Sequence, residues 1–263
     1  MTDDETALRG ALVELSKHVH EFDYSRSPAE ISYQALMTVQ GYLGVDDPYR
    51  EEKLLYNTRI LALEGDLRGL IDAAADPLHT AVKLAVAGNI IDLGIIGEFD
   101  LDAHIGKALD VGLKIDEYPL LRARLDAARS IIYVLDNAGE VVFDKLLIEQ
   151  LGGERVTAVV RRKPVLNDVT MADAVQVGVD RICEVIDTGC DIFGVPIRNA
   201  SEAFRRRFYA ADVVISKGQA NYETLEDCGR EVFFILMAKC PAVARKLGVE
   251  VHDCVLKHQA GGR

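Results

Sequence analysis

The sequence predicts an α/β protein, a three-layer α/β/α sandwich with a mostly parallel sheet and an additional N-terminal helical region. Three observations support this prediction. Apolar residues recur at helical spacing through the first third of the chain. After about residue 130, short β-branched runs alternate with helical patterns, as in parallel sheets that are covered on both faces. Apolar residues make up 49% of the 263 residues, which is enough for a sizeable core.

The helical region is expected over residues 1–128. Its first apolar residues share one helix face, because they recur in steps of three and four: Leu8, Leu12, Leu15 and Val19. Pro28 can begin the next helix, since the first turn of a helix needs no N–H from proline. Further helices are expected after the turn at Asp46-Asp47-Pro48, over residues 61–75 and over residues 77–89.

The α/β core is expected over residues 129–263. Five apolar runs predict its strands, at residues 131–135, 156–160, 182–186, 212–216 and 232–236. A helical pattern such as that of residues 141–151 supplies the long crossover that parallel neighbours require. Open parallel sheets bind ligands at the carboxyl ends of their strands. Polar residues that follow the five runs are therefore the first candidates for a site.

Composition and charge argue against several classes of protein. Asp and Glu number 42 against 30 Lys and Arg, and a net charge of −12 leaves no broad cationic face for nucleic acid. The five cysteines have no close CxxC spacing, so we expect neither a disulfide scaffold nor a zinc knuckle. The first residues are acidic, and no apolar run approaches the roughly 18 residues that span a bilayer. We expect a cytoplasmic protein with no membrane partner.

Polar residues gather after three of the predicted strands. In chain order they are Asp136-Asn137, Asn167-Asp168 and Lys217. Each alone is typical of a helix N-cap, a turn or a solvated strand end. Together, two carboxylates and an amide oxygen form a hard ligand set suited to Mg²⁺ or Mn²⁺, while lysine and neighbouring glycines suit a phosphate group. The combination is typical of metal-assisted phosphoryl transfer.

Asn89 and Asp92 are further candidates, although Gly88 before them is equally consistent with a simple helix end. Other familiar chemistries lack their motifs. The sequence has no GxGxxG after a strand, no GxxxxGK[ST], no GxSxG and no HExxH. In this order, the absent motifs argue against a dinucleotide-binding site, a Walker A loop, the nucleophile elbow of an α/β-hydrolase and a zinc metalloprotease of the HExxH type.

An ordered set of motifs spans residues 47–251. The motifs lie at residues 47–49, 87–92, 136–140, 163–170, 216–225, 237–240, 243–244 and 247–249. Together they resemble the damage-control phosphatase family, and most closely its short stand-alone prokaryotic branch. Many relatives in that branch begin with a cysteine-containing segment, whereas this chain has no cysteine before Cys183.

The resemblance implies a metal-dependent phosphatase that hydrolyses phosphomonoesters of small metabolites, such as sugar phosphates or damaged phosphometabolites. It implies that Asp136, Asn137 and Asp168 bind Mn²⁺, Co²⁺, Ni²⁺ or Mg²⁺. Lys217 and Lys239 would contact the phosphoryl group, which makes these five the candidate catalytic residues. The candidate substrate-binding residues are Asn89, Asp92, Glu140, Lys217, Gly218, Gln219, Asn221 and Lys239.

Alternatives stay open at this point. The attacking group is either water or the Asp136 carboxylate, which a trapped phospho-aspartate would distinguish. A non-catalytic binder of a phosphorylated metabolite would retain the same pocket. A methyltransferase of similar architecture would need a glycine-rich loop after the first strand, where Ala138-Gly139-Glu140 supplies one glycine. The oligomeric state is open as well.

Overall fold

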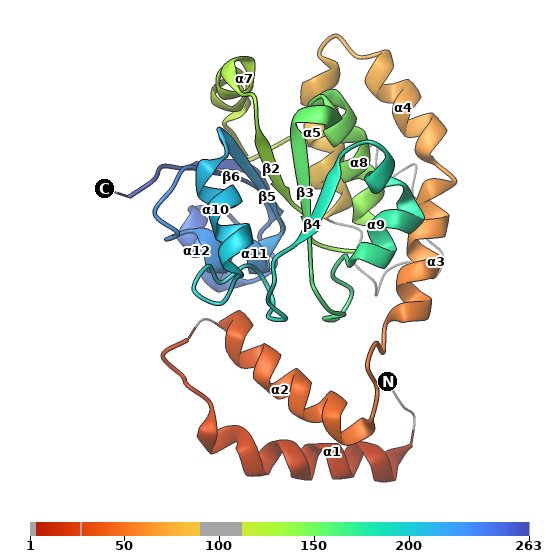
Figure 1. Cartoon of the computed structure of the whole chain (residues 1–263), viewed down its shortest axis with the longest axis vertical. Helices are drawn as coiled ribbons and strands as arrows, with labels where there is room; N and C mark the ends of the chain where they lie inside the picture. Colours follow the sequence, from red (N-terminus) through yellow and green to blue (C-terminus); the bar gives the residue numbers. More distant parts are fainter. Residues whose placement is uncertain (1–3, 27, 90–111, 263) are drawn as a thin grey trace.

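The computed structural model describes residues 4–26, 28–89 and 112–262, and a seven-stranded sheet lies at its centre (Figure 1). In chain order the strands are β1 (Ile115–Asp116), β2 (Ile131–Val134), β3 (Val156–Val160), β4 (Glu184–Asp187), β5 (Val213–Lys217), β6 (Val232–Met237) and β7 (Cys254–Gln259). Across the sheet they follow the order β1-β7-β6-β5-β2-β3-β4. All neighbours pair in parallel except β6 and β7, which are antiparallel. The predicted fold class is confirmed.

The five predicted strands form within two residues of their expected ends, as β2 to β6. The strands β1 and β7 are additions that the sequence pattern does not predict. β1 has only two residues, so it has no apolar pattern to recognise. β7 mixes buried and half-buried residues and pairs with β6 along its whole length. Its strand character therefore depends on pairing with β6 and not on a strong pattern of its own.

Helices cover both faces of the sheet, and β2 shows why. Ile131 and Tyr133 pack into one hydrophobic cluster with helices α5 (Pro77–Gly88), α8 (Glu140–Gln150) and α9 (Met171–Val177). Ile132 and Val134 point the other way, because side chains alternate along a strand, and join α10 (Glu202–Ala210), α11 (Gln219–Leu225) and α12 (Pro241–Leu247). The result is a three-layer sandwich with a core on each side of the sheet.

The remaining α-helices of the described ranges lie in the first half of the chain. They are α1 (Glu5–His18), α2 (Pro28–Leu43), α3 (Arg50–Leu61), α4 (Glu64–Asp72) and α7 (Tyr118–Ala127). Asp4 caps α1 by accepting a hydrogen bond from the Thr6 N–H at 2.8 Å, which satisfies one of the free donors of the first turn. Within the described ranges, no helix is both long enough and apolar enough to cross a bilayer.

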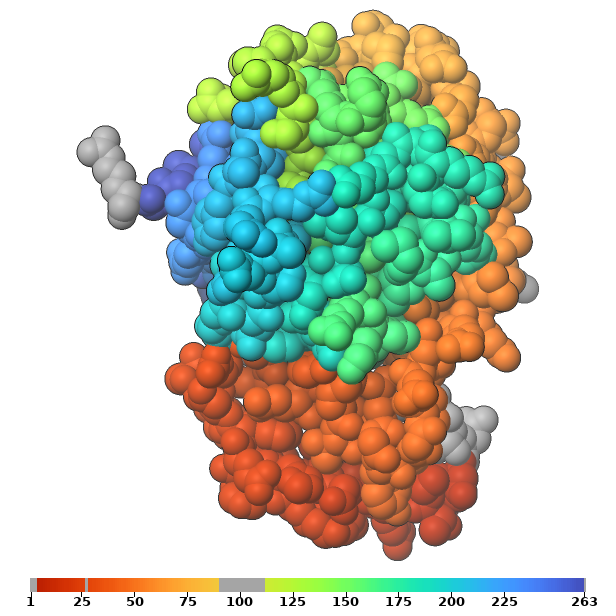
Figure 2. All heavy atoms as spheres, viewed as in Figure 1, coloured from red at the N-terminus to blue at the C-terminus, as the bar shows by residue number. Residues whose placement is uncertain are grey.

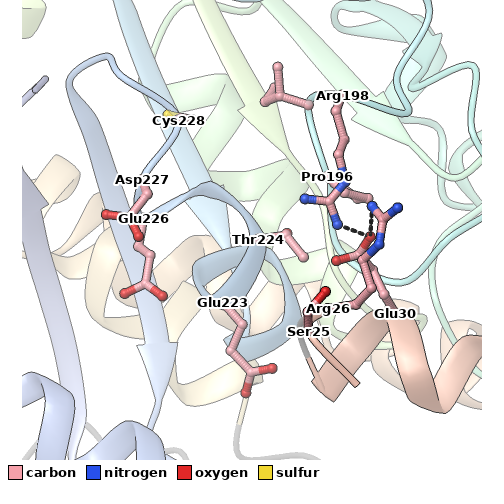
Figure 3. A pocket seen from close by; sticks show the side chains of 11 residues that line it. Ser25, Arg26, Glu30, Pro196, Arg198, Glu223, Thr224, Glu226, Asp227 and Cys228 are labelled. Carbon is pink, nitrogen blue, oxygen red and sulfur yellow. Dashed lines mark hydrogen bonds and ion pairs between the residues drawn. The ribbon is translucent and has the colours of Figure 1, made fainter. Parts of the chain in front are cut away.

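The helix α2 lies across the carboxyl edge of the sheet, where Figure 2 shows the N-terminal helices packed against the core. Ala29 of α2 packs on Val165, which follows β3, and on Phe193, which follows β4. Glu30 accepts a hydrogen bond from Arg198 and lies 3.7 Å from Arg26, as Figure 3 shows from close by. Apolar contacts and a half-buried ion cluster thus hold α2 over the edge where ligands bind in such sheets.

The hydrophobic core runs across the division predicted at residue 128. Val82 and Leu84 of α5 belong to the same buried cluster as Ile131 of β2 and Phe143 of α8. The helices α5 and α8 pack directly against each other. The division into residues 1–128 and 129–263 stays a prediction, and α5 forms part of one layer of the sandwich.

Candidate functional site

The structure brings the three predicted metal ligands together at the carboxyl edge of the sheet. Asp136 and Asn137 follow β2, and Asp168 lies in the connection from β3 to α9. An isolated antiparallel bridge joins Asn137 to Asp168. The Val169 N–H also donates to the Asp136 carbonyl at 2.8 Å. Backbone bonding therefore sets the distance between the two carboxylates, which are each only 6% exposed.

Negative charge exceeds positive charge around Asp136. Burial and the carboxylates of Glu140 and Asp168 raise the pKa of Asp136 to about 8, although Lys239 and Arg161 act in the opposite direction. Burial also raises the pKa of Asp168, against the effect of the Arg161 guanidinium. A divalent cation at this point would offset the excess charge and favour the ionised carboxylates.

Arg161 is a site residue that the sequence patterns do not single out. It is 1% exposed, and its Nε donates to Asp168 Oδ2 at 2.6 Å. Its Nη2 donates to Asn221 Oδ1, also at 2.6 Å, and Asn221 Nδ2 donates to the Lys217 carbonyl at the same distance. Arg161 thus holds Asp168 from one side and links it to the end of β5. Its position directly after β3 is the one signal in the sequence that could have found it.

Lys217 is completely buried and paired with two carboxylates. Its side chain is 0% exposed, and Nζ donates to Glu140 and, at 2.7 Å, to Asp144. Tyr133 donates its hydroxyl to the same Asp144 oxygen at 2.7 Å. Burial opposes the charge on Lys217, but Asp144 and Glu140 outweigh this effect and raise the pKa of the lysine. Asp144 sits in the middle of α8, where no sequence pattern marks it.

Asn89, a predicted substrate-binding residue, connects three parts of the candidate site. Its Nδ2 lies 3.0 and 3.1 Å from the two Glu140 oxygens and 3.4 Å from Asp136 Oδ2. Its Oδ1 accepts from the Met237 N–H at 3.0 Å, at the end of β6. The other candidate from this segment, Asp92, lies outside the described residues.

Gly218 and Gln219 shape the wall of the site next to Asp136. Gly218 has φ +80°, and a Cβ atom there would lie 1.9 Å from Asp136 Oδ2. Only glycine allows the chain to turn this close to the carboxylate. Gln219 accepts a hydrogen bond from the Lys239 N–H at 2.9 Å, which holds the end of β6 beside α11. The Lys239 side chain is half-buried, unlike that of Lys217.

The helix α3 supports the loop after Asp136-Asn137 and the first turn of α9 through further residues that the sequence patterns do not single out. Asn57 is fully buried, and its Oδ1 accepts from the Gly139 N–H at 2.7 Å, in the loop after Asp136-Asn137. Lys53 Nζ lies 3.2 Å from both Asp47 Oδ2 and Asp173 Oδ2. The sequence signal that could have found them is their spacing: Lys53 and Asn57 lie four residues apart, so they share one face of α3. Polar side chains on a buried helix face need polar partners elsewhere in the protein.

The donor set fits a hard divalent cation. Among the described residues, no group of three or more His, Cys, Asp and Glu side chains is placed to bind a metal, so a zinc-type cluster is not indicated. Two carboxylates and the Asn137 amide form an all-oxygen alternative. The described part of the chain donates hydrogen bonds to the carboxylates of Asp136 and Asp168 only at Oδ2. Within the described ranges, Oδ1 of each carboxylate thus accepts no hydrogen bond and could serve as a metal ligand.

Comparison with known proteins identifies a family and several relatives. Residues 1–255 match the family model described as "Damage-control phosphatase ARMT1-like domain". The "Damage-control phosphatase PH1575" of Pyrococcus horikoshii is 34% identical over 94% of this chain and 88% of its own. A "Damage-control phosphatase" of Archaeoglobus fulgidus is 33% identical over 98% and 92%. The crystal structure of the Pyrococcus horikoshii protein, titled as a DUF89 family protein, superposes with a TM-score of 0.86 at 32% identity, over 98% of this chain and 92% of that one.

These relatives support hydrolase activity and a phosphatase role in metabolite repair. The likeness extends over almost the whole length of both curated relatives, so it includes the carboxyl edge and the helices that cover it. The order of motifs in the sequence, the parallel sheet and the polar cluster at its edge lead to the same assignment. The chain belongs to the damage-control phosphatase ARMT1-like domain family.

Proposed function

We propose that this protein is a divalent-metal-dependent phosphatase that hydrolyses phosphomonoesters of small phosphorylated metabolites. The observation that carries the proposal is the pair of buried carboxylates of Asp136 and Asp168, which lie in a region of excess negative charge. A backbone bridge between Asn137 and Asp168 holds their two loops together. A phosphate dianion would be repelled there unless a cation is bound as well. Mg²⁺, Mn²⁺, Co²⁺ and Ni²⁺ all accept oxygen ligands of this type.

Each residue has a separate role in this proposal. Asp136, Asn137 and Asp168 hold the metal, which when bound supplies positive charge that polarises the phosphoryl group. Arg161 holds one Asp168 oxygen and so orients the other. Lys239 contacts the phosphoryl oxygens and offsets charge that develops on them. We assign Lys217 a different role, which is to balance the buried charges of Glu140 and Asp144 beneath the site.

A phosphate-release assay with and without EDTA tests the proposal. We expect release of phosphate from a panel of sugar phosphates and other phosphometabolites, loss of release in EDTA, and recovery when Mn²⁺, Co²⁺, Ni²⁺ or Mg²⁺ is restored. Release that is unchanged by EDTA would contradict the metal site. Binding of phosphometabolites without any release, at every metal tested, would show instead a non-catalytic binder.

Lys239→Ala is expected to lower kcat/KM by about ten- to a hundredfold, the effect of one charge-assisted contact. Lys239 acts on the phosphoryl group and is not a metal ligand, so metal affinity measured by calorimetry should stay close to that of the wild type. Lys246→Ala is the matched control, because its side chain is 53% exposed and pairs with Glu226 on the surface. Loss of metal binding in Lys239→Ala, or full activity, would show that its role is wrongly assigned.

A further inference from the structure

Glu140, the first residue of α8, is a buried carboxylate beside the proposed metal ligand Asn137. It is only 1% exposed. Its Oε1 accepts hydrogen bonds from Lys217 Nζ and, at 3.1 Å, from Asn89 Nδ2. Its Oε2 accepts from Asn89 Nδ2 at 3.0 Å and from Asn137 Nδ2 at 3.3 Å. Donors of the protein therefore occupy both oxygens, so Glu140 is placed to act on a metal ligand and not to be one.

Two fixed donors hold the Glu140 carboxylate in place. Asn89 Oδ1 accepts from the Met237 N–H at 3.0 Å, so the Nδ2 of the same amide has to face Glu140. Lys217 carries hydrogen-bond donors and no acceptor on its side chain. Met237 ends β6 and Lys217 ends β5. The position of the carboxylate is therefore set by two strands of the sheet.

The Asn137 amide is oriented in turn by the carboxylates beside it. Its Nδ2 donates to Asp136 Oδ2 at 2.7 Å and to Glu140 Oε2 at 3.3 Å. An amide nitrogen has two hydrogens, and both are used here. The reversed amide would place Oδ1 against two acceptors. Oδ1 is therefore directed away from these oxygens, and in the described part of the chain no group donates to it.

A cavity of about 630 Å³ beside α2 has no such connection to a metal ligand. Its lining includes Gln40 and Asp191, but neither Asn137 nor Glu140. Gln40 Nε2 and Asp191 Oδ1 lack partners among the described residues, yet both atoms have almost no accessible surface and so do not face the cavity. The contacts of Glu140, in contrast, lead directly to the candidate site.

We propose that Glu140 is a positioning residue, which holds the Asn137 amide so that Oδ1 and not Nδ2 is presented to the divalent cation. The inference rests on the proposed function, because that function requires the metal. Hydrogen-bond partners of metal ligands orient them and often matter for affinity nearly as much as the ligands do. The role differs from substrate binding, which the family resemblance implies for this residue.

Glu140→Gln should favour the reversed orientation of the Asn137 amide. Lys217 Nζ and Asn89 Nδ2 are donors, so the one oxygen of the glutamine would face them and its nitrogen would face Asn137. A donor at that point repels Asn137 Nδ2 and attracts Oδ1. We expect the dissociation constant for Mn²⁺, measured by calorimetry, to rise by about ten- to a hundredfold.

A double-mutant cycle with Asn137→Ala separates this orientation from a simple effect of charge. Once the Asn137 amide is removed, Glu140→Gln should change the Mn²⁺ dissociation constant by less than about threefold. Asp144→Asn is the matched control, because Asp144 is also a buried carboxylate paired with Lys217 but is bonded to Tyr133 and not to Asn137. Its effect should be equal with and without Asn137→Ala. An equal loss from Glu140→Gln in both backgrounds, or no loss, would overturn the inference.

NMR of the metal-free protein tests the contact itself, and it decides the question if Glu140→Gln is unstable or Asn137→Ala binds Mn²⁺ too weakly to measure. The Asn137 side-chain amide is identified by its loss in Asn137→Ala. In the wild type its hydrogens should exchange with water at least about tenfold more slowly than those of Asn199, which is exposed. Exchange as fast as that of Asn199 would show that no carboxylate holds the amide.

Neither measurement uses a substrate, so the inference and the proposed function can fail separately. A wild type that binds Mn²⁺ with the expected coupling but releases no phosphate would contradict the phosphatase function alone. A wild type that binds Mn²⁺ and releases phosphate without the coupling would overturn the role of Glu140 alone. Absence of Mn²⁺ binding to the wild type would contradict both.

Discussion

Asp136→Asn is expected to lower kcat by orders of magnitude and, at the same time, to stabilise the metal-free protein. The substitution removes a charged ligand, so metal binding weakens and added metal should restore little activity. It also removes a buried carboxylate that Glu140 and Asp168 repel. Each kcal/mol regained should raise the unfolding midpoint by about 2–4 °C. Calorimetric metal titration, steady-state kinetics and thermal unfolding in EDTA measure the three effects.

The gain in stability should grow with pH. The unfolded Asp136 ionises near pH 4, whereas the folded group keeps its proton until about pH 8. Between these values the folded state binds more protons, so the stability of the metal-free wild type falls as pH rises. Asparagine has no proton to lose, and the variant should lack this decline.

Asp126→Asn is the control, because the Asp126 carboxylate is 70% exposed. It should change neither activity nor the pH dependence of stability. If Asp136→Asn proved less stable than the wild type at pH 8, the excess of negative charge at the site would be wrongly inferred. Retained metal affinity in the same variant would remove Asp136 from the ligand set.

Lys217→Met is expected to destabilise the protein by about 3–5 kcal/mol, because it leaves Glu140 and Asp144 buried without their cation. The midpoint of thermal unfolding should fall by about 6–20 °C. Burial and the Glu140 carboxylate already raise the pKa of Asp144 to about 6 against the effect of Lys217. Without the lysine, Asp144 should be protonated at neutral pH.

Two further variants make this result specific. Lys246→Met removes an exposed ion pair and should change stability by less than about 1 kcal/mol. The double variant Lys217→Met/Asp144→Asn should recover part of the stability lost in Lys217→Met. It removes the Asp144 carboxylate that the single variant leaves buried without a cation. Lys217→Met with wild-type stability but reduced affinity for phosphate would instead favour direct contact with the phosphoryl group, the role that the sequence predicts for this lysine.

Local patterns are sufficient to predict the central strands and most of the helices. The five apolar runs form β2 to β6. Four of them, β2, β3, β5 and β6, are almost completely buried between the two helical layers, whereas β4 lies at the edge of the sheet and is partly exposed. The rule that ligands gather at the carboxyl ends of parallel strands predicts that the polar residues after these strands lie close together. The family resemblance then singles out Asp136, Asn137 and Asp168, which the structure brings together. These residues are close in space because their strands, β2 and β3, are neighbours in the sheet.

Other features depend on contacts that no local pattern encodes. The sequence predicts that Lys217 contacts the phosphoryl group, but no pattern indicates its pairing with Asp144, a residue 73 positions away in the chain. Arg161 begins a run of three basic residues that connects the second predicted strand to the next segment. The structure buries its guanidinium against Asp168. The same local sequence allows a charged side chain to be exposed or buried. Burial is favourable only where the fold places partners of opposite charge beside it, and the local sequence does not show those partners.

The sequence by itself determined the fold class, the five central strands and the three residues that meet at their carboxyl edge. Only the tertiary structure decided that β7 pairs antiparallel with β6, that α2 lies over the edge, and that Gln40 and Asp191 belong to the lining of one cavity. The physical reason is the range of the interactions. The spacing of apolar residues along a helix or strand involves residues close in the chain, so it is visible in the sequence. The walls of a cavity come from segments far apart in the chain, such as those of Gln40 and Asp191, which are about 150 residues apart.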